Sequence, residues 1–390
     1  MNNYFNQKNR RFLTGIAVAL AALPLTSAVS QAQLPPTASQ FWTGADLSAL
    51  TFREGQDFRY SDAQGEADLL KIARRNGWNM IRVRLWVDPK NDPFDAASSL
   101  QSVTQLGKRI KAEKLGFMLD IHYSDTWADP GAQRKPHAWK DLKFPALVEQ
   151  TRVYSRDVIA HLRENGALPD MVQIGNETRN GLLYGSELNG AGPQLGGGFW
   201  EKMPDGRDRA VQLLSADLEG VKQGAAPDKT PQTIVHVPDG QNPQFTADYF
   251  RELCASARKQ NIDLDFDIIG LSYYPAHPWD KKVGYSGWKL ERLQQSMNQL
   301  ARDYGKPVMI VETAWPRAGN PENDVADAPQ FAFTPAGQVE FYRALIGAVR
   351  AVPNGLGIGV LPWDQDSRNW DSVFEDRGHA LPAVATLGKK

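Results

Sequence analysis

The feature that most constrains the fold of this sequence is a recurrence of short apolar segments. Eight segments rich in β-branched and apolar residues alternate with longer stretches of helical character. The segments are Thr43 to Leu47, Asn79 to Trp86, Gly116 to Tyr123, Met171 to Glu177, Thr233 to Val237, Phe266 to Tyr274, Pro307 to Thr313 and Gly357 to Trp363. They recur about every 45 residues. Because strands that alternate with helices form a parallel sheet, the pattern predicts an α/β fold, a single (β/α)8 TIM barrel with extended βα loops.

The stretches between the segments have the periodicity of helices. In Gln101 to Leu115, the residues Val103, Leu106 and Ile110 fall on one face, and Ala146 to Glu164 repeats apolar residues four apart. Glycine after such a stretch is typical of a helix end. Four glycines are predicted to end helices in this way: Gly77, Gly116, Gly166 and Gly305.

The N-terminal region has the pattern of an export signal. A basic region that includes Arg10 and Arg11 precedes an apolar stretch from Phe12 to Leu25. A small-x-small sequence follows at Ser30 to Ala32. The alternative is a membrane anchor, but the apolar stretch is short for a bilayer crossing. We therefore expect a signal peptide over 1–32, a catalytic domain over 33–390, and export to the periplasm or the medium.

Charge and cysteine content exclude several classes of partner. The formal net charge of −1 gives no reason to expect nucleic acid or an anionic membrane as a partner. Cys254 is the single cysteine, so an internal disulfide or a cysteine-based metal cage cannot form. We expect no nucleic-acid partner, no membrane partner after signal cleavage, no cofactor, and a monomer stabilised by a large core.

Two glutamates stand at the ends of predicted strands, where the chemistry of a barrel belongs. Glu177 follows the apolar run that begins at Met171, and Glu312 follows the run that begins at Val308. The fourth and seventh strands occupy roughly opposite sectors of the ring, so the two carboxyls can face each other. Such a pair can hydrolyse a glycosidic bond, with a separation of about 5–5.5 Å in retaining and about 6.5–9.5 Å in inverting enzymes. The alternative is a carboxylate that only neutralises an arginine such as Arg84.

Aromatic residues gather near the same strand ends. A sugar ring has an apolar face that indole rings cover and a hydroxyl rim that Asn, Asp, His and Arg can bind. A single tryptophan is more often core filler, but the set favours a carbohydrate site. These tryptophans are Trp86, Trp127, Trp139, Trp279, Trp315, Trp363 and Trp370, of the 11 in the chain.

Other constellations are weaker. The residues His122, Asp125, His137 and His277 match no zinc spacing, so we assign no metal site. The acidic stretch around Asp324 and Asp327 lacks the calcium-loop pattern, and no Gly-x-Ser-x-Gly elbow is present. The glycine-rich segment 189–198 lacks the Lys-Ser/Thr of a phosphate-binding loop and is interpreted as a flexible loop.

Several motifs together resemble a known family. They are Gly44-Ala45-Asp46-Leu47-Ser48, Ile81-Arg82-Val83-Arg84-Leu85-Trp86-Val87, the run from Asp120 to Gly131 that begins Asp-Ile-His-Tyr-Ser-Asp-Thr-Trp, Gln173-Ile174-Gly175-Asn176-Glu177, Gly270-Leu271-Ser272-Tyr273-Tyr274-Pro275 and Val311-Glu312-Thr313-Ala314. The chain is similar in these motifs, over roughly residues 40 to 385, to the arabinogalactan endo-β-1,4-galactanases, glycoside hydrolase family 53. The Asn-Glu pair is shared by a wider clan of retaining barrel hydrolases.

The resemblance implies a secreted, retaining, endo-acting enzyme on β-1,4-galactan, the galactose side chains of pectin. It implies that Glu177 is the acid/base and Glu312 the nucleophile. Hydrogen bonds from Arg84 and Tyr273 would keep Glu312 ionised, and Asn176 would hold the sugar 2-hydroxyl. The substrate-binding residues expected on this basis are Arg84, Trp86, His122, Asp125, Trp127, Asn176, Tyr273, Trp315 and Trp363.

The resemblance also leads to expectations around the eighth strand. Trp363 would form the floor under the cleaved sugar, and clan members often have a cis peptide after this tryptophan, here Trp363–Asp364. The sequence departs from the family at Asp364-Gln365-Asp366, where Glu-Pro and a second aromatic are more usual. That difference concerns the outer subsites. Two alternatives stay open: the same chemistry on another β-1,4-linked polysaccharide such as mannan, xylan or glucan, and a non-catalytic carbohydrate-binding barrel.

Overall fold

The computed structural model describes residues 40–184, 205–277, 282, 284–319, 325 and 327–389. The predicted export signal (1–32), the glycine-rich segment 189–198, Trp279 and Asp324 lie outside these ranges. None of the helices in the described ranges combines the length and the apolar character that crossing a membrane would require.

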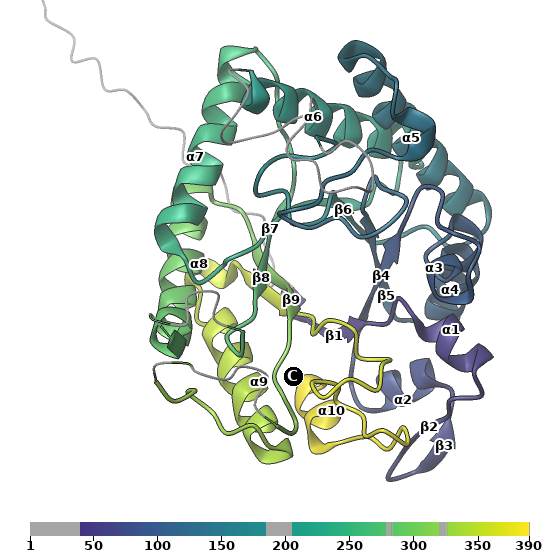
Figure 1. The fold of residues 1–390 in the computed structure, drawn as a ribbon, viewed down its shortest axis with the longest axis vertical. Coiled ribbons are helices and arrows are strands. Elements are labelled where there is room, and N and C mark those ends of the chain that lie inside the picture. Colours follow the sequence, from purple (N-terminus) through teal and green to yellow (C-terminus); the bar gives the residue numbers. More distant parts are fainter. Residues whose placement is uncertain are drawn as a thin grey trace, which may run out of the picture. The chain divides into compact units, whose positions relative to one another are not determined.

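Eight parallel strands close into a barrel, in the spatial order β1-β10-β9-β8-β7-β6-β5-β4 (Figure 1). Their bounds are β1 Trp42–Asp46, β4 Met80–Leu85, β5 Gly116–Ile121, β6 Met171–Ile174, β7 Gln232–Val237, β8 Ile268–Tyr273, β9 Val308–Thr313 and β10 Gly357–Val360. Each overlaps one of the eight predicted segments, so the predicted TIM barrel is confirmed. A separate antiparallel hairpin joins β2 (Tyr60–Asp62) and β3 (Gly65–Ala67).

Helices surround the barrel in the order that the sequence predicts (Figure 1). The α-helices are α1 Leu50–Gly55, α2 Leu69–Arg75, α3 Pro93–Ala96, α4 Leu100–Ala112, α5 Phe144–Glu164, α6 Gly206–Gly224, α7 Pro243–Lys259, α8 Leu290–Tyr304, α9 Pro335–Arg350 and α10 Pro382–Leu387. Short 3-10 helices are η1 His137–Trp139, η2 Gly284–Trp288 and η3 Pro353–Gly355.

Local sequence accounts for where these helices begin. In α4, the Ser99 side chain accepts a hydrogen bond from the Ser102 amide, which satisfies one of the free N–H groups of the first turn. The predicted apolar face of α4 is confirmed, since Val103, Leu106 and Ile110 are all buried.

Three of the four predicted helix-ending glycines have the expected left-handed backbone. Gly77, Gly166 and Gly305 follow their helices with φ of +91°, +70° and +62°. The prediction for Gly116 is wrong. Lys114 turns the chain after α4 with φ +58°, and Gly116 is the first residue of β5.

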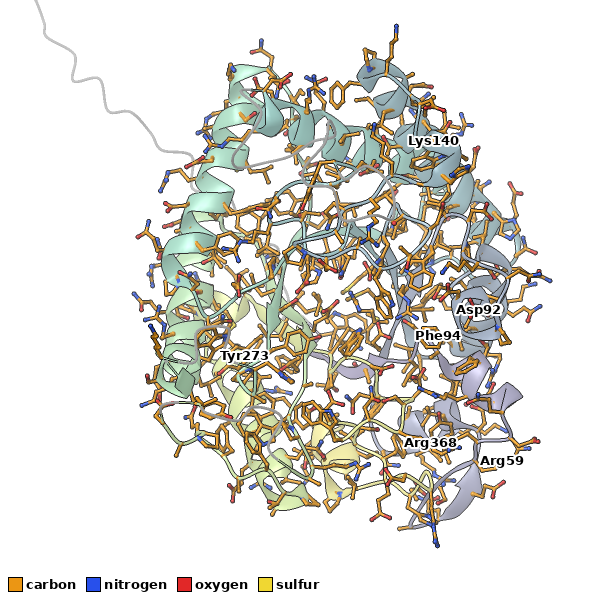
Figure 2. All side chains as sticks on the ribbon, in the orientation of Figure 1. Arg59, Asp92, Phe94, Lys140, Tyr273 and Arg368 are labelled. Carbon is orange, nitrogen blue, oxygen red and sulfur yellow. The ribbon has the colours of Figure 1, made fainter. Side chains whose placement is uncertain are left out.

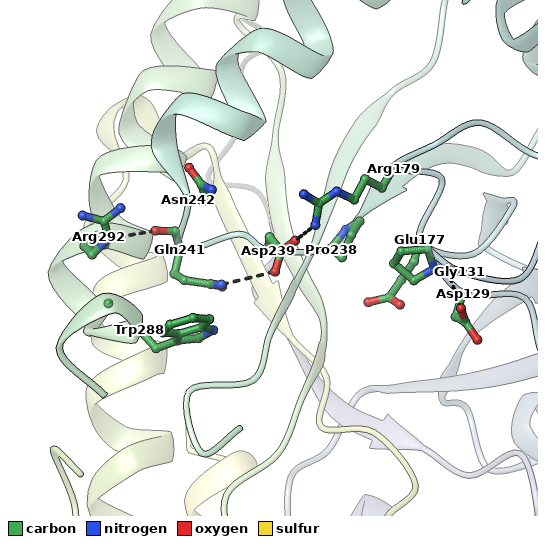
Figure 3. Close-up of a pocket in the computed structure, with 12 residues that line it drawn as sticks. Asp129, Gly131, Glu177, Arg179, Pro238, Asp239, Gln241, Asn242, Trp288 and Arg292 are labelled. Carbon is green, nitrogen blue, oxygen red and sulfur yellow. Dashed lines mark hydrogen bonds and ion pairs between the residues drawn. The ribbon is translucent and has the colours of Figure 1, made fainter. Parts of the chain in front are cut away.

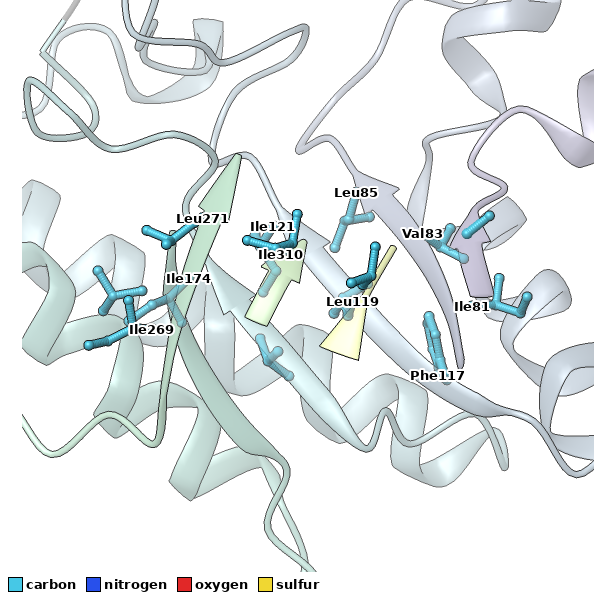
Figure 4. Close-up of a cluster of buried hydrophobic side chains, with 14 of the residues drawn as sticks. Ile81, Val83, Leu85, Phe117, Leu119, Ile121, Ile174, Ile269, Leu271 and Ile310 are labelled. Atoms are coloured by element: carbon cyan, nitrogen blue, oxygen red, sulfur yellow. The ribbon is translucent and has the colours of Figure 1, made fainter. Parts of the chain in front are cut away.

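The strands alternate between two layers of apolar packing. Residues at every second position point outward and pack under the helices, as Figure 4 shows for Ile81, Val83 and Leu85 of β4. The intervening positions point into the barrel and form a separate interior cluster. That cluster comprises Met80, Met118, Met171, Ile234, Ile268, Met309, Val311, Ile358 and Leu361. The interior of the ring is therefore filled by side chains, and the site can lie only above this layer. Figure 2 draws the side chains in the same orientation as Figure 1.

Candidate active site

A polar layer lies directly above the apolar layer inside the barrel. Two residues beyond an interior apolar side chain, the same strand carries a polar one that points in the same direction. These pairs are Met80 and Arg82, Met118 and Asp120, Met171 and Gln173, and Ile234 and His236. All four polar side chains are buried, so the layer needs a hydrogen-bond partner for each group.

Arg82 is the cation at the centre of this layer. Its Nη1 donates to Asp46 Oδ2 at 2.7 Å, and its Nη2 donates to Asp120 Oδ2 at 2.8 Å and to Glu312 Oε1 at 2.6 Å. Burial opposes the charge of Asp120, but Arg82 and His122 outweigh it and lower the pKa of Asp120 to about 2. One guanidinium therefore holds three buried carboxylates in place.

The predicted hydrogen bond from Arg84 to Glu312 is wrong, because Arg82 makes it. Arg84 Nε donates to Ser98 Oγ at 2.9 Å, and its guanidinium lies 4.0 Å from the centre of the Trp127 ring. Alternation gives both arginines the same inward direction, so they differ only in height along the strand, by about 6.6 Å for two residues. Only Arg82, which is nearer the start of the strand, lies at the level of Glu312.

A β-bulge aims Glu312 into the barrel. Leu271 of β8 pairs with Ile310, but Ser272 pairs with Glu312, so Val311 is an extra residue on β9. Met309 and Val311 both belong to the interior cluster. Without the bulge, strict alternation would place Glu312 on the outer, helix-facing side.

The predicted hydrogen bond from Tyr273 to Glu312 is also wrong. The Tyr273 hydroxyl donates to the carbonyl of Trp288 at 2.7 Å, and its ring stacks on Phe341, outside the barrel. Tyr274, one residue further on, donates to Glu312 Oε2 at 3.0 Å. The reason is the alternation of β8, in which Ser272 points inward and Tyr273 outward.

Glu177 lies beside Glu312 at the end of β6. The strand stops at Ile174, and Gly175 and Glu177 both adopt left-handed backbone, with φ of +81° and +47°. Left-handed backbone in a residue other than glycine is uncommon and is found at functional sites. Ser272 Oγ donates to Glu177 Oε1 at 2.7 Å. One oxygen of Glu177, one of Glu312 and a ring nitrogen of His236 lie within 4.8 Å of one another.

The environment separates the proton affinities of the two glutamates. Burial raises the pKa of Glu177 well above its ordinary value, and the charge of Glu312 raises it further. Burial raises the pKa of Glu312 only to about 6, because the Arg82 guanidinium opposes the rise. These shifts favour a protonated Glu177 beside an ionised Glu312 at neutral pH, the combination that acid–base chemistry requires.

Two cavities meet at Glu177. One, of about 750 Å³, lies over Glu312. It is lined by His122, Trp127, Ala128, Asp129, Asn176, Glu177, Tyr274, His277, Glu312, Trp363, Asn369, Trp370 and Asp371. The other, of about 760 Å³, extends past β7 towards α8 and is lined by Arg179, Asp239, Gln241, Trp288 and Arg292 among others (Figure 3). Asp129 and Glu177 line both cavities, so the two form one cleft with Glu177 at the junction.

Four of the predicted substrate-binding residues line this cleft: His122, Trp127, Asn176 and Trp363. The Asn176 amide nitrogen donates to Ala128 O at 2.8 Å, and its oxygen accepts from Arg82 Nη2 at 3.1 Å. Trp127 packs edge-on against Trp363 with ring centres 5.9 Å apart. These contacts fix the aromatic rings and the amide before any ligand binds.

The other predicted substrate-binding residues do not line either cavity. Trp86 is fully buried against Trp127, and Trp315 is buried, stacked on Phe341 at 4.8 Å. Asp125 accepts hydrogen bonds from the backbone amides of Asp88 and His137, and so joins two loops. Together with Arg84 and Tyr273, these residues support the wall of the cleft.

The backbone after β10 differs from expectation. No peptide bond in the described ranges is cis, so the predicted cis peptide at Trp363–Asp364 is wrong. Asp364 instead turns the chain with φ +53°. Its carboxylate accepts from the Asn369 amide at 2.7 Å, and Asn369 and Trp370 line the cleft. The sequence that departs from the family therefore supports the rim of the cleft, where Trp370 is 38% exposed.

The residues around the two glutamates that sequence reasoning missed include Arg82, Asp120, Gln173, His236, Ser272 and Tyr274. A signal for them exists, because each lies an even number of residues from an interior apolar position of the same strand. Counting every second residue from the start of each strand would have identified Arg82 and Gln173 as inward-pointing, and would have identified Tyr273 as outward-pointing.

Two buried histidines of the site have protein partners, and one of them, His122, was considered as a metal ligand. His122 accepts from the Ala128 amide at Nδ1 and contacts Asp120 Oδ2 at 2.9 Å through Nε2. His236 is likewise engaged at both ring nitrogens, with Gln173 at 3.0 Å and Ser272 at 2.8 Å. Asp327 accepts from the amides of Tyr285 and Ser286. Each of these groups thus has a protein partner that accounts for its position.

The chain is similar to known proteins across nearly the whole barrel. The model of glycosyl hydrolase family 53 matches residues 42–385. The probable arabinogalactan endo-beta-1,4-galactanase A of Aspergillus terreus is 36% identical over 334 residues, which are 84% of this chain and 86% of that protein. The arabinogalactan endo-beta-1,4-galactanase A of Aspergillus niger is 33% identical over 342 residues, 87% of each chain.

Solved structures agree with these matches. A structure described among two fungal beta-1,4-galactanases superposes with a TM-score of 0.76 at 28% identity and covers 89% of this chain and 98% of that chain. The GH53 catalytic domain of Ignisphaera aggregans superposes with a TM-score of 0.75 at 26% identity and covers 91% and 97%.

Proposed function

Because the chain belongs to glycosyl hydrolase family 53 and is a glycoside hydrolase, we propose that it is a retaining endo-β-1,4-galactanase that cleaves the galactan side chains of pectin. The relatives named above are galactanases of the arabinogalactan type, which supports this choice of substrate. We further propose that the enzyme is a monomer and that it is exported, the latter on the strength of the N-terminal sequence pattern.

The observation that carries the retaining mechanism is the proximity of the two glutamates. Carboxylate oxygens of Glu177 and Glu312 lie within 4.8 Å. Retaining enzymes hold their carboxyl groups about 5–5.5 Å apart, whereas inverting enzymes leave about 6.5–9.5 Å for a water molecule. This spacing therefore suits direct attack by one glutamate on the anomeric carbon.

The first step needs a proton on Glu177 and a charge on Glu312. Glu177 protonates the leaving glycosidic oxygen while Glu312 Oε2 or Oε1 attacks the anomeric carbon and forms a glycosyl ester. Arg82 and Tyr274 hold both oxygens of Glu312, so the carboxylate reaches the sugar without having to reorient.

The second step reverses the proton transfer. Once Glu312 is esterified, its negative charge no longer raises the pKa of Glu177, and Glu177 has given up its proton. The Glu177 carboxylate then removes a proton from water, which attacks the anomeric carbon and releases Glu312. Two inversions give a product with the configuration of the substrate.

The cleft is suited to a polysaccharide that passes through it. Glu177 stands at the junction of the two cavities, so sugars can extend on both sides of the cleaved bond. Trp127 and Trp363 offer aromatic faces near Glu312, and Trp288 offers one in the other cavity. A cleft that extends on both sides of Glu177 supports cleavage within a chain.

We expect the purified protein to release short galacto-oligosaccharides from linear β-1,4-galactan, and to leave mannan, xylan and glucan nearly intact. The measurement is product sizing on the four polysaccharides, with proton NMR of the first product anomer. A β-anomer formed first supports retention. If another polysaccharide is hydrolysed as fast as galactan, the proposed galactan specificity is wrong. If none of the four is hydrolysed, the result favours a non-catalytic carbohydrate-binding protein.

The two pKa shifts predict a bell-shaped pH dependence of kcat/KM. Glu312 must be ionised, so activity should fall as the pH drops through about 6, the pKa of Glu312. Glu177 must be protonated, and because its pKa is raised well above the ordinary value, the alkaline limb should lie above neutral pH. Initial rates on galactan across the pH range, at substrate well below KM, test this. An acid limb near the ordinary glutamate value of about 4.3 would contradict it.

A further inference from the structure

The site contains a directional hydrogen-bond chain that ends on the proton carrier. Gln173 Nε2 lies 3.0 Å from His236 Nδ1, His236 Nε2 lies 2.8 Å from Ser272 Oγ, and Ser272 Oγ lies 2.7 Å from Glu177 Oε1. The chain crosses strands β6, β7 and β8, and its residues are buried except for Glu177 at the cleft. It touches no substrate directly, because Gln173, His236 and Ser272 do not line either cavity.

The direction of the chain is set by its first member. Gln173 Oε1 faces Arg82 Nε at 3.3 Å, and arginine can only donate. Gln173 Nε2 faces Asp120 Oδ1 at 2.5 Å, and an ionised carboxylate can only accept. These two neighbours orient the amide, so its NH2 group is the one that faces His236 and donates to Nδ1.

A second donor reaches the same ring nitrogen. The backbone amide of Glu177 donates to His236 Nδ1 at 3.2 Å, a direction that the left-handed backbone at Glu177 provides. Asn176 Oδ1 also lies 3.2 Å from Nδ1, but this oxygen already accepts from Arg82 Nη2. The backbone amide of Glu177 can only donate, so Nδ1 carries the lone pair and the ring proton lies on Nε2.

We propose that Ser272 and His236 are positioning residues that place the transferable proton of Glu177 on Oε2. His236 Nε2–H donates to Ser272 Oγ, which leaves the single hydroxyl hydrogen of Ser272 to donate to Glu177 Oε1. Oε1 is then an acceptor, so in the acid form the proton lies on Oε2. After proton transfer the same hydrogen bond stabilises the carboxylate that acts as base.

Surrounding charges keep this arrangement in one protonation state. Burial lowers the pKa of His236 well below its ordinary value, and the charge of Arg82 lowers it further, so the ring stays neutral. The titratable and charged groups that face His236 are Arg82, Asp120, His122, Glu177 and Glu312. Those that face Glu177 are Glu312, Tyr274, Asp239 and Asp129.

The inference rests on the proposed function for its kinetic test, which compares Ser272→Ala with Ser272→Thr on galactan. Removing the hydroxyl removes a donor to the ionised form, so the pKa of Glu177 rises. We expect the alkaline limb of kcat/KM to move up by about one pH unit in Ser272→Ala, and kcat to fall about tenfold. Ser272→Thr retains the hydroxyl and should restore the wild-type limb.

A matched control removes a buried serine hydroxyl beside a different buried carboxyl. Ser155 on α5 donates to Asp217 Oδ1 at 3.5 Å, away from the cleft. Ser155→Ala should leave the pH profile unchanged. The proposal would be overturned if the alkaline limb of Ser272→Ala were the same as that of the wild type. It would also be overturned if the alkaline limb of Ser272→Thr matched that of Ser272→Ala.

A second measurement needs neither substrate nor variant. Nitrogen-15 NMR of the histidines in the wild-type enzyme should show His236 as the neutral Nε2–H tautomer across the pH range of activity. A Nδ1–H tautomer or a cationic ring would overturn the positioning role even if galactan is the substrate. If the enzyme cuts no galactan while this tautomer is observed, the substrate assignment fails and the proton placement stands.

Discussion

Replacing Glu312 by glutamine should lower turnover on β-1,4-galactan by about 10⁵–10⁶-fold, as removal of a covalent nucleophile does in other enzymes. The amide has nearly the shape of the carboxylate but cannot form the glycosyl ester. Arg82 keeps its ion pairs with Asp46 and Asp120, so the barrel should stay folded. Initial rates and the thermal unfolding midpoint of Glu312→Gln are the measurements.

The control for this variant is Glu54→Gln. Glu54 is also paired with an arginine, Arg109, but lies outside the cleft. It should keep the wild-type rate. In Glu312→Gly, azide should restore activity on an activated aryl galactoside and give the α-configured galactosyl azide, because azide replaces the missing nucleophile. If Glu312→Gln stays folded and retains a rate within about tenfold of the wild type, Glu312 is not the nucleophile.

Replacing Glu177 by glutamine should reduce turnover on galactan by about 10²–10⁴-fold, the usual contribution of a general acid. A dinitrophenyl galactoside has a leaving group that needs no proton, so its first step should stay fast. The second step still lacks a base. We therefore expect a burst of dinitrophenolate followed by slow turnover, which stopped-flow absorbance resolves.

Azide separates the acid/base function from a structural one. Azide needs no general base to attack the glycosyl-enzyme, so it should speed the slow phase of Glu177→Gln and yield a β-galactosyl azide. Glu312→Gln offers the contrast, because it should show no burst on the same substrate. Slow release in the first step of Glu177→Gln, with no response to azide, would mean that this residue supports the cleft without transferring a proton.

The barrel was predictable from sequence because each of its signals is local. Alternation of apolar segments with helical periodicity gives the eight βα units, and closure follows from the packing of both faces of a parallel sheet. The sequence predicts the ends of the strands less accurately. The prediction extended the fourth strand to Glu177, whereas β6 ends at Ile174 and two left-handed residues follow.

The placement of the two glutamates in one cleft was also predictable from the sequence. A carboxylate that ends a buried strand needs a partner or a function, and two of them at the mouth of one barrel favour a pair that works together. The partners of Glu312 were not within reach. Arg82 and Arg84 point the same way, so only the staggered register of the closed barrel decides which reaches Glu312.

Local sequence patterns thus predict a barrel with Glu177 and Glu312 at strand ends, because periodicity and strand ends are properties of neighbouring residues. Only the contacts between strands explain why an extra residue, Val311, rotates Glu312 inward to within reach of Glu177, and why Tyr274 instead of Tyr273 contacts it. A bulge and a register depend on the adjacent strand, which lies tens of residues away along the chain.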